Sequence, residues 1–303
     1  MKFEVTILGC GSATPTLRHG PTSQLINHDD HYFLFDCGEG SQLQLRRYNI
    51  KFQRINHVFI THLHGDHCLG LPGLLSTMHL LGRTKDLHIY ANAALQEAIE
   101  IQLRVSYSRL RFQLKWHALS NDAPQTIMEN DRIEVRSFPL NHRVPCCGFI
   151  ISEKPKPRNM LTEMIEKYNI PFVRIRQIKA GADYVLENGE VILNAELTSP
   201  PPAPKSYAFC TDTAFAEKAI EAVRGVDLLY HESTFLEKDR QRAYDTFHST
   251  AGDAARVAKA AGVRKLMLGH YSARYHDLNL FLEEARAIFK PTILGDEGLT
   301  TRV

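Results

Sequence analysis

The segment THLHGDH at residues 61–67 is the part of the sequence best suited to bind metal ions. It places His62, His64, Asp66 and His67 directly after the apolar stretch HVFI. Nitrogen and carboxylate ligands of this mix suit Zn²⁺, with Mn²⁺ or Fe²⁺ as alternatives. A tight turn at the intervening glycine would let the first two histidines face one ion and the last two residues face another. A chance cluster in a chain with 15 histidines is the competing interpretation, and the dense spacing disfavours it.

Three further candidate ligands lie far downstream, each just beyond the end of an apolar segment: His142, Asp212 and His270. A single polar residue after a strand is usually a cap or turn residue. In open sheets, however, binding sites assemble at the carboxyl ends of the strands. Together with the cluster at residues 61–67, these positions predict one metal centre built from distant parts of the chain.

The elements that must position these ligands alternate along the chain. Runs rich in β-branched and aromatic residues predict strands at 3–8, 32–36, 57–61, 133–138, 206–210, 226–230 and 265–268. Apolar periodicity predicts helices at 41–48, 73–81, 93–105, 215–223, 251–261 and 278–289. Thr250 and Asp253 have the spacing of a capping box at the start of the fifth helix. We therefore expect an α/β protein with mixed sheets covered by helices.

Composition and charge narrow the class of protein. The chain has 303 residues, 44% hydrophobic and 23% charged, which is typical of a globular protein with an ample core and excludes disorder, collagen and a disulfide-stapled miniature. Its net charge of +2 does not support a strongly basic nucleic-acid binder, although a small net charge can hide a local patch. Six cysteines without a CxxC pair favour reduced thiols. The N-terminus does not resemble a signal peptide, and the apolar run at 69–82 is too short to cross a bilayer, so we expect a soluble cytoplasmic protein with no membrane segment.

Residues 152–204 depart from this rhythm. Prolines in KPKPR and LTSPPPAP punctuate the segment, and we expect little of it beyond a short amphipathic stretch at 160–168 to bury well. Residues 151–180 carry seven basic and three acidic side chains, whereas residues 181–199 carry four acidic ones. The segment is predicted to be an insertion, either a variable surface loop or a functional arm whose basic half contacts an RNA backbone.

Several motifs in a fixed order carry a family resemblance: GCGSATP (9–15), FDCGEG (35–40), THLHGDHCLGLPG (61–73), NH (141–142), CTDT (210–213), HEST (231–234), FHST (247–250) and GHYSARY (269–275). They resemble the metallo-β-lactamase superfamily and, more narrowly, the ribonuclease Z family of endonucleases that mature the 3′ end of transfer RNA. HLHGDH is typical of the whole superfamily, whereas HEST, FHST and HYSARY sharpen the resemblance.

This resemblance implies an αββα sandwich forming a single domain over residues 1–303, with residues 152–204 as an inserted flexible arm. In the family the arm is an exosite that grips transfer RNA away from the cleavage point. Family members act as homodimers in which the arm of one subunit serves the other. Many bacterial members carry a Gly-Pro-rich arm tip, where this chain has NIPFVRIRQIKAG.

The resemblance also implies a site with two Zn²⁺ ions per subunit, or Mn²⁺ in their place. His62, His64 and His142 would hold one ion, Asp66, His67 and His270 the other, and Asp212 would bridge them. Two such ions lower the pKa of a water and stabilise the charge of an in-line displacement at phosphorus.

The same resemblance implies roles in proton transfer. Asp66 would also act as general base, and His248, oriented by Glu232, would be the acid–base helper. Taken without the family, Glu232 could equally cap a turn, and His248 could be an unremarkable residue before a helix. We interpret His231 as a packing residue and Arg274 as either a phosphate contact or a structural ion pair.

Two glycine-rich turns have a supporting interpretation. GCGSATP lacks both the full dinucleotide fingerprint and the P-loop lysine, so we expect a tight turn approaching the substrate or the metals. In FDCGEG, Asp36 and Gly38 are expected to form a turn that supports the metal-binding loop.

The function implied is a metal-dependent endoribonuclease, a hydrolase that removes the 3′ trailer from precursor transfer RNA. The alternative is a small-molecule phosphodiesterase on the same dinuclear metal scaffold. A non-catalytic RNA-binding protein that keeps the fold is a third hypothesis, and the presence of every expected ligand argues against it.

Overall fold

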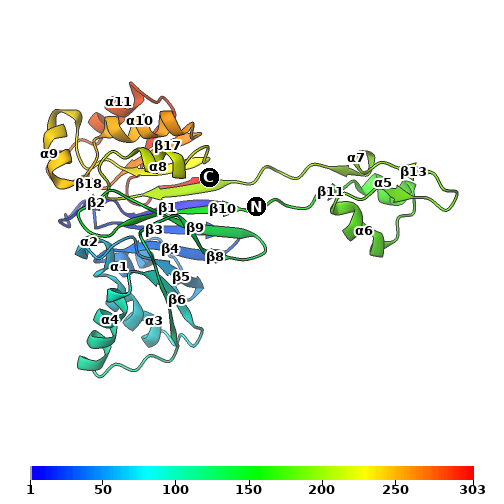
Figure 1. Ribbon diagram of the computed structural model, residues 1–303. Coiled ribbons are helices and arrows are strands. Elements are labelled where there is room, and N and C mark those ends of the chain that lie inside the picture. Colours follow the sequence, from blue (N-terminus) through cyan, green and yellow to red (C-terminus); the bar gives the residue numbers. More distant parts are fainter. Residues whose placement is uncertain (1) are drawn as a thin grey trace. The chain divides into compact units, whose positions relative to one another are not determined.

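The computed structural model describes residues 2–303, which divide into two compact units (Figure 1). The larger unit contains residues 2–128, 135–151 and 205–303, and the smaller contains 129–134 and 152–204. The larger unit carries both central sheets and every residue predicted to bind metal.

The first sheet has seven strands, in the order β20 (Thr300–Arg302), β1 (Phe3–Gly9), β3 (Ser23–His28), β4 (His31–Cys37), β5 (Ile55–Phe59), β6 (Leu87–Ala91) and β7 (Leu114–Ala118). Strands β4 to β7 run parallel, whereas β1, β3 and β4 pair antiparallel. The parallel part brings the carboxyl end of β5, and the loop that follows it, to one edge of the sheet.

The second sheet also has seven strands, in the order β19 (Thr292–Leu294), β17 (Lys265–Gly269), β16 (Leu228–Glu232), β15 (Ser206–Cys210), β10 (Cys147–Glu153), β9 (Ile133–Pro139) and β8 (Gln125–Glu129). Strands β15, β16, β17 and β19 are parallel neighbours. Their carboxyl ends therefore lie at a common edge, where Asp212, Glu232 and His270 are found.

The two sheets pack face to face around aromatic side chains. The ring of Phe35 from the first sheet lies 5.3 Å from Phe149 and 5.8 Å from Phe209 of the second, measured between ring centroids. All three side chains are fully buried, each contributing roughly 1.5–3 kcal/mol of burial free energy. This layer fixes the relation of one sheet to the other, and with it the edge that carries the site.

Helices cover the outer faces (Figure 1). On the first sheet they are α1 (Ser41–Arg47), α3 (Leu71–Leu80) and α4 (Ala94–Val105). On the second they are α8 (Glu217–Ala222), α10 (Ala251–Ala261) and α11 (Asn279–Arg286). The larger unit also contains short elements: β2 (Gly11–Ser12), α2 (Gly65–Cys68), α9 (Arg240–Thr246), β18 (Tyr271–Ser272) and the 3₁₀ turns Phe52–Arg54 and Glu237–Asp239. The predicted αββα sandwich is thus confirmed.

The predicted elements agree with the structure within a few residues. The helix predicted at 251–261 has the same two ends in the structure. Thr250 and Asp253 form the expected capping box at its start. The strand predicted at 57–61 instead spans 55–59, which leaves Thr61 and His62 free to turn into the site. Strand β3 was missed because its sequence, SQLINH, lacks an apolar alternation, although all six residues are buried.

The smaller unit has a small core of its own, which the sequence did not predict, although most of its residues are exposed or half-buried, as expected. It contains β11 (Asn159–Met160), α5 (Thr162–Lys167), α6 (Phe172–Lys179), β12 (Tyr184–Val185), β13 (Val191–Ile192), α7 (Asn194–Leu197) and β14 (Thr198–Ser199). Its buried side chains are Ile170, Ile178, Ile192 and Leu197. These residues are too widely spaced to produce a periodic pattern, which is why the sequence did not reveal them.

No helix among the described residues combines the length and the apolar character needed to cross a membrane. All six cysteines fall within the described range and are buried free thiols.

Candidate metal centre

The HLHGDH segment follows β5 and continues into α2. Gly65, where a tight turn was expected, is the first residue of this short helix. His64 precedes α2 in an extended conformation, and Asp66 and His67 lie within it. This change of backbone direction points His64 and His67 to different positions. Gly38 passes so close beneath α2 that a Cβ atom there would collide with the carbonyl oxygen of Asp66, which explains the glycine in FDCGEG.

The first ligand set consists of His62, His64, His142 and Asp212, whose ligand atoms all lie within 4.8 Å of one another. Nδ1 of His64 lies 3.0 Å from Nε2 of His62 and 3.3 Å from Nε2 of His142. Such short separations between ring nitrogens are those of ligands converging on one ion.

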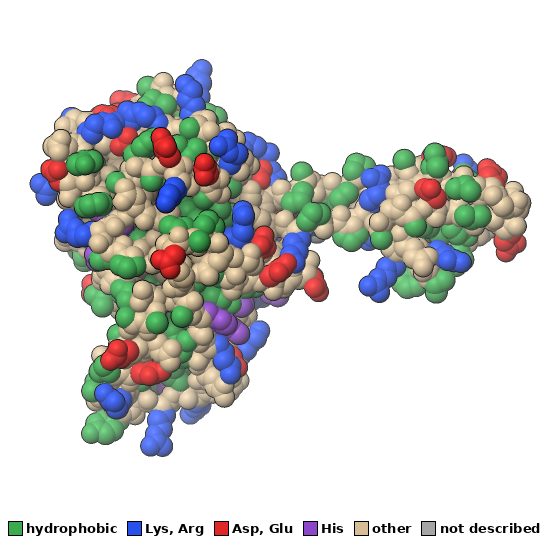
Figure 2. All heavy atoms as spheres, in the orientation of Figure 1, with side chains coloured by type: hydrophobic (Ala, Val, Ile, Leu, Met, Phe, Trp, Pro, Cys, Tyr) green, Lys and Arg blue, Asp and Glu red, His purple; other side chains and the backbone are tan. Residues whose placement is uncertain are grey.

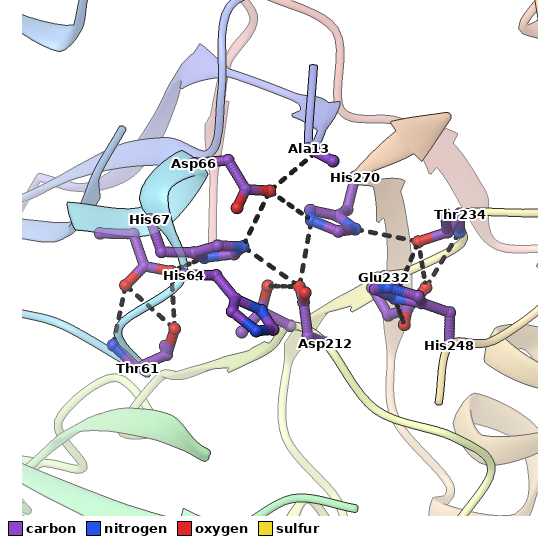
Figure 3. A network of polar contacts seen from close by, with 12 residues as sticks. Ala13, Thr61, His64, Asp66, His67, Asp212, Glu232, Thr234, His248 and His270 are labelled. Atoms are coloured by element: carbon purple, nitrogen blue, oxygen red, sulfur yellow. Dashed lines mark hydrogen bonds and ion pairs between the residues drawn. The ribbon is translucent and has the colours of Figure 1, made fainter. Parts of the chain in front are cut away.

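The second ligand set consists of Asp66, His67 and His270, again within 4.8 Å of one another. Oδ2 of Asp66 lies 3.5 Å from Nε2 of His67 and 3.6 Å from Nε2 of His270. The same Asp66 oxygen accepts a hydrogen bond of 2.8 Å from the N–H of Ala13, so the GCGSATP turn approaches the metal-binding residues as expected (Figure 3).

Asp212 connects the two sets, because its two carboxylate oxygens face different histidines. Oδ1 lies 3.0 Å from Nε2 of His270 and 3.3 Å from Nε2 of His67. Oδ2 lies 3.6 Å from Nε2 of His62 and 3.7 Å from Nε2 of His142. This is the arrangement of a carboxylate that can bridge two ions.

Hydrogen bonds fix the outer nitrogen of four histidines. The Nδ1–H of His67 donates to Asp36 at 2.7 Å, and that of His142 donates to the carbonyl of Phe247 at 3.1 Å. Nδ1 of His62 and of His270 lie 3.1 and 2.9 Å from threonine hydroxyls, those of Thr61 and Thr234. With Nδ1 protonated in this way, each Nε2 keeps a lone pair directed at the centre of the site.

The buried ring nitrogens and carboxylates of the site favour a bound cation. Nε2 of His67 and of His270 are buried and make no hydrogen bond to any described residue. Burial and the neighbouring histidines lower the pKa of His62 to about 2, so its ring is neutral. Although burial opposes ionisation, His270 and His67 hold the pKa of Asp212 well below its usual range. Burial opposes protonation of His67, but Asp212 and Asp36 raise its pKa well above the usual range. Ionised carboxylates among converging imidazoles therefore fit a pair of divalent cations, which would replace the positive charge of a protonated ring.

Beside the ligands lies a histidine–carboxylate pair. Nδ1 of His248 lies 2.8 Å from Oε1 of the fully buried Glu232. Glu232 also accepts hydrogen bonds from the N–H groups of Thr213 and Thr234 and from the Thr234 hydroxyl. Burial of His248 opposes its protonation, but Glu232 outweighs this effect and raises the pKa of His248 to about 9. The ring of His248 is therefore held in one orientation and carries a proton at neutral pH.

These groups open into a pocket of about 470 Å³. Its wall includes His64, Asp66, His142, Asp212 and His248 together with side chains not predicted to act, such as Arg143 and Leu69. The structure thus brings all seven predicted ligands and the predicted His248–Glu232 pair into one cluster, and part of this cluster lines the pocket.

Three supporting residues were not given their observed roles by the sequence. Thr61 and Thr234 contact ligand histidines, and Asp36, expected only to form a turn, orients His67. Their presence within THLHGDH, HEST and FDCGEG marked them as candidate supporting residues, but the motifs do not specify which ring each one contacts. Arg274 lies over the ring of Phe235 and 4.0 Å from Asp239, which favours the structural interpretation. His231 is fully buried, as expected of a packing residue.

The sandwich and the two ligand sets define a protein of the metallo-β-lactamase fold. A sequence model described as a beta-lactamase superfamily domain matches residues 202–271, and one described as anti-Pycsar protein Apyc1 matches residues 3–159. The metallo-beta-lactamase fold protein YhfI from Bacillus subtilis superposes with a TM-score of 0.69 at 18% identity, covering 99% of this chain and 98% of its own.

Full-length relatives narrow the class further. Ribonuclease Z of Bacteroides fragilis is 48% identical over 298 residues, 98% of each chain, and that of Parabacteroides distasonis is 48% identical over 301 residues, 99% of each. The short form of human tRNase Z superposes with a TM-score of 0.74 at 25% identity, covering 99% of both chains. The chain belongs to the ribonuclease Z family.

Proposed function

We propose that this protein is a metal-dependent endoribonuclease that removes the 3′ trailer from precursor transfer RNA. The observation that carries the proposal is the Asp212 carboxylate between two histidine sets, in the same pocket as the Glu232–His248 pair. The near-complete coverage by ribonuclease Z relatives supports the same substrate.

The proposed cofactor is a pair of Zn²⁺ ions, with Mn²⁺ as the alternative. His62, His64 and His142 would hold one ion, Asp66, His67 and His270 would hold the other, and Asp212 would contact both. Bound in this way, the ions would lower the pKa of a water and stabilise negative charge on the phosphodiester.

The chain's own groups then control the protons. Burial raises the pKa of Asp66, but His270 and His67 lower it by more, so this carboxylate is ionised. We propose that it orients the attacking water and takes its proton as the new bond to phosphorus forms. His248, protonated and held by Glu232, donates to the leaving 3′ oxygen. The products are a matured RNA with a 3′-hydroxyl and a trailer with a 5′-phosphate.

Residues 152–204 are proposed as an arm that binds the transfer RNA away from the cleavage point. Helix α6 exposes Phe172 and Val173, 86% and 77% accessible, next to Arg174 and Arg176. Figure 2 shows basic and apolar side chains mixed over the surface of this unit. Cationic groups contact phosphates without reading sequence, and an exposed aromatic ring can stack on a base. We further propose a cytoplasmic homodimer in which each arm serves the partner's site.

The test is a cleavage assay on one precursor transfer RNA with both new ends mapped, run with and without a chelator. We expect a single cut with the end groups given above, abolished by the chelator and restored by Zn²⁺ or Mn²⁺. Faster turnover of cyclic nucleotides than of precursor would contradict the proposal.

Deleting residues 155–195 should separate binding from chemistry. Removing six basic side chains weakens precursor binding, while hydrolysis of bis-p-nitrophenyl phosphate is retained because the metal centre lies in the other unit. Affinity is measured at several salt concentrations. An unchanged affinity and salt dependence would refute the role of the arm.

A further inference from the structure

A second cluster of metal-ligating side chains lies outside the metal centre, at Cys10, His19 and Asp296. Their ligand atoms all lie within 4.8 Å of one another. Sγ of Cys10 is 3.9 Å from Oδ1 of Asp296, and Nε2 of His19 is 3.0 Å from the same oxygen. Cys10 directly follows β1, His19 lies four residues beyond the GCGSATP turn, and Asp296 lies in the segment after β19.

These separations suit a small tetrahedral ion. Bond lengths of about 2.0 Å to nitrogen or oxygen and about 2.3 Å to sulfur place ligand atoms roughly 3.3–3.5 Å apart at tetrahedral angles. The observed separations of 3.0 and 3.9 Å bracket this range, so side-chain shifts of a few tenths of an ångström complete the geometry. A thiol, an imidazole and a carboxylate form a donor set that favours Zn²⁺ over Mg²⁺ or Ca²⁺.

The backbone already holds each ligand in place. The carbonyl of Cys10 accepts a hydrogen bond of 2.8 Å from the N–H of Tyr271, and His19 is tied to Thr16 through its N–H at 2.9 Å. Next to Asp296, the N–H of Gly295 donates to the carbonyl of Leu268 at 2.7 Å. The site is therefore pre-organised, and an ion would not have to order a mobile loop.

The charge around the cluster also favours a cation. Cys10 is fully buried, and burial together with the carboxylates of Glu297 and Asp296 raises its pKa well above the usual range. A divalent cation reverses this effect, because it stabilises the thiolate and releases the thiol proton to solvent. The side chain of Asp296 is 56% exposed and that of His19 15%, which leaves a route for the ion from solvent.

We propose that Cys10, His19 and Asp296 form a third metal site, selective for a borderline-soft divalent ion such as Zn²⁺. Cys10 and His19 stand at the two ends of the loop 11–18, whose Ala13 N–H contacts Asp66 in the metal centre. An ion at this site would add a cross-link at the base of that loop, where the N–H of Gly11 already donates to the carbonyl of Gly20 at 2.9 Å. The inference goes beyond the proposed function and does not require it.

Cobalt substitution tests the site directly. The two ligand sets of the metal centre contain only histidine and aspartate, so a thiolate-to-Co²⁺ charge-transfer band in the near ultraviolet must come from a cysteine. We expect metal-stripped protein to develop this band on titration with Co²⁺, and Cys10→Ala to lose it. Cys146→Ala is the matched control, because Sγ of Cys146 lies 3.6 Å from Nδ1 of His62, and its band should remain.

Zinc stoichiometry gives the second measurement. We expect about three Zn²⁺ per chain in the wild type and about two in Cys10→Ala and in Asp296→Asn, an exposed and conservative change that should not impair folding. Absence of the cobalt band in the wild type, its persistence in Cys10→Ala, or an unchanged zinc content in both variants would overturn the third site. Because neither measurement uses RNA, these results are independent of the cleavage assay.

Discussion

Two buried carboxylates, Asp36 at β4 and Glu232 at the end of β16, support the metal centre from opposite sheets. Each bonds one histidine directly, Asp36 with His67 at 2.7 Å and Glu232 with His248 at 2.8 Å. Each also accepts a hydrogen bond from a threonine hydroxyl, which in turn contacts a second histidine. The same arrangement of carboxylate, threonine and two histidines thus occurs twice around one site.

The two arrangements differ in where the directly bonded histidine points. His67 is fully buried and directs its other nitrogen at Asp212, so Asp36 supports metal binding alone. The side chain of His248 is 14% exposed and lines the pocket, so Glu232 also prepares a proton donor. In the proposed mechanism, the exposure of the histidine, and not the carboxylate that holds it, distinguishes a metal ligand from a proton donor.

His67→Ala should have the largest effect. It removes a ligand of the second set, so we expect about one bound ion to be lost and cleavage to fall by roughly 10⁴-fold. Metal content and single-turnover cleavage are measured on the same preparation. His117→Ala, a half-buried histidine on β7, is the control, and full metal content in His67→Ala would contradict the ligand assignment.

His248→Ala should lower kcat by about 10³-fold while both ions stay bound, because it removes the proton donor and no ligand. KM for the precursor should change little. A loss of metal comparable to that in His67→Ala would show that the two arrangements have the same role after all.

Contacts between residues that are far apart in the sequence were harder to predict than the ligand positions themselves. The convergence of the candidate ligands was predictable because each follows an apolar strand, and the resemblance to ribonuclease Z supplied their proposed grouping. The threonine contacts were not, since the hydroxyl of Thr234 meets His270 36 residues away and that of Thr61 meets Asp36 25 residues away. No local pattern specifies which buried hydroxyl will meet which ring.

The same limit applies to the fold. Strand β15 at residues 206–210 was predicted at both ends, whereas β16 lies two residues beyond its predicted position and the apolar strand β10 was not predicted. Strand β3 and the core of the smaller unit were missed, because a polar strand becomes buried only when both of its neighbours are present. Local propensity cannot report such tertiary burial.

Replacing Glu232 or Asp36 by its amide should have an effect of intermediate size and should distinguish the roles of the two carboxylates. Glu232 raises the pKa of His248 to about 9, so the protonated ring is lost as pH rises through that value. Glu232→Gln should therefore move the alkaline limb of the kcat profile to lower pH. Asp36→Asn should leave that limb in place and weaken binding of one ion by about 10–100-fold. A shifted limb in Asp36→Asn would show that the two carboxylates are not specialised.

Substitution of Thr61 or Thr234 should give the smallest effects, and the two variants should weaken metal binding to a similar extent. Thr61→Val and Thr234→Val each remove a hydroxyl that donates to a carboxylate and contacts a ligand histidine, without changing the shape of the side chain. The loss of one such hydrogen bond, about 0.5–1.5 kcal/mol, weakens metal binding up to roughly tenfold. Only Thr234→Val should also alter the pH profile, because Thr234 donates to the carboxylate that holds His248. Serine at either position keeps the hydroxyl and should restore both properties, whereas equal pH profiles for the two valine variants would remove the distinction between the arrangements.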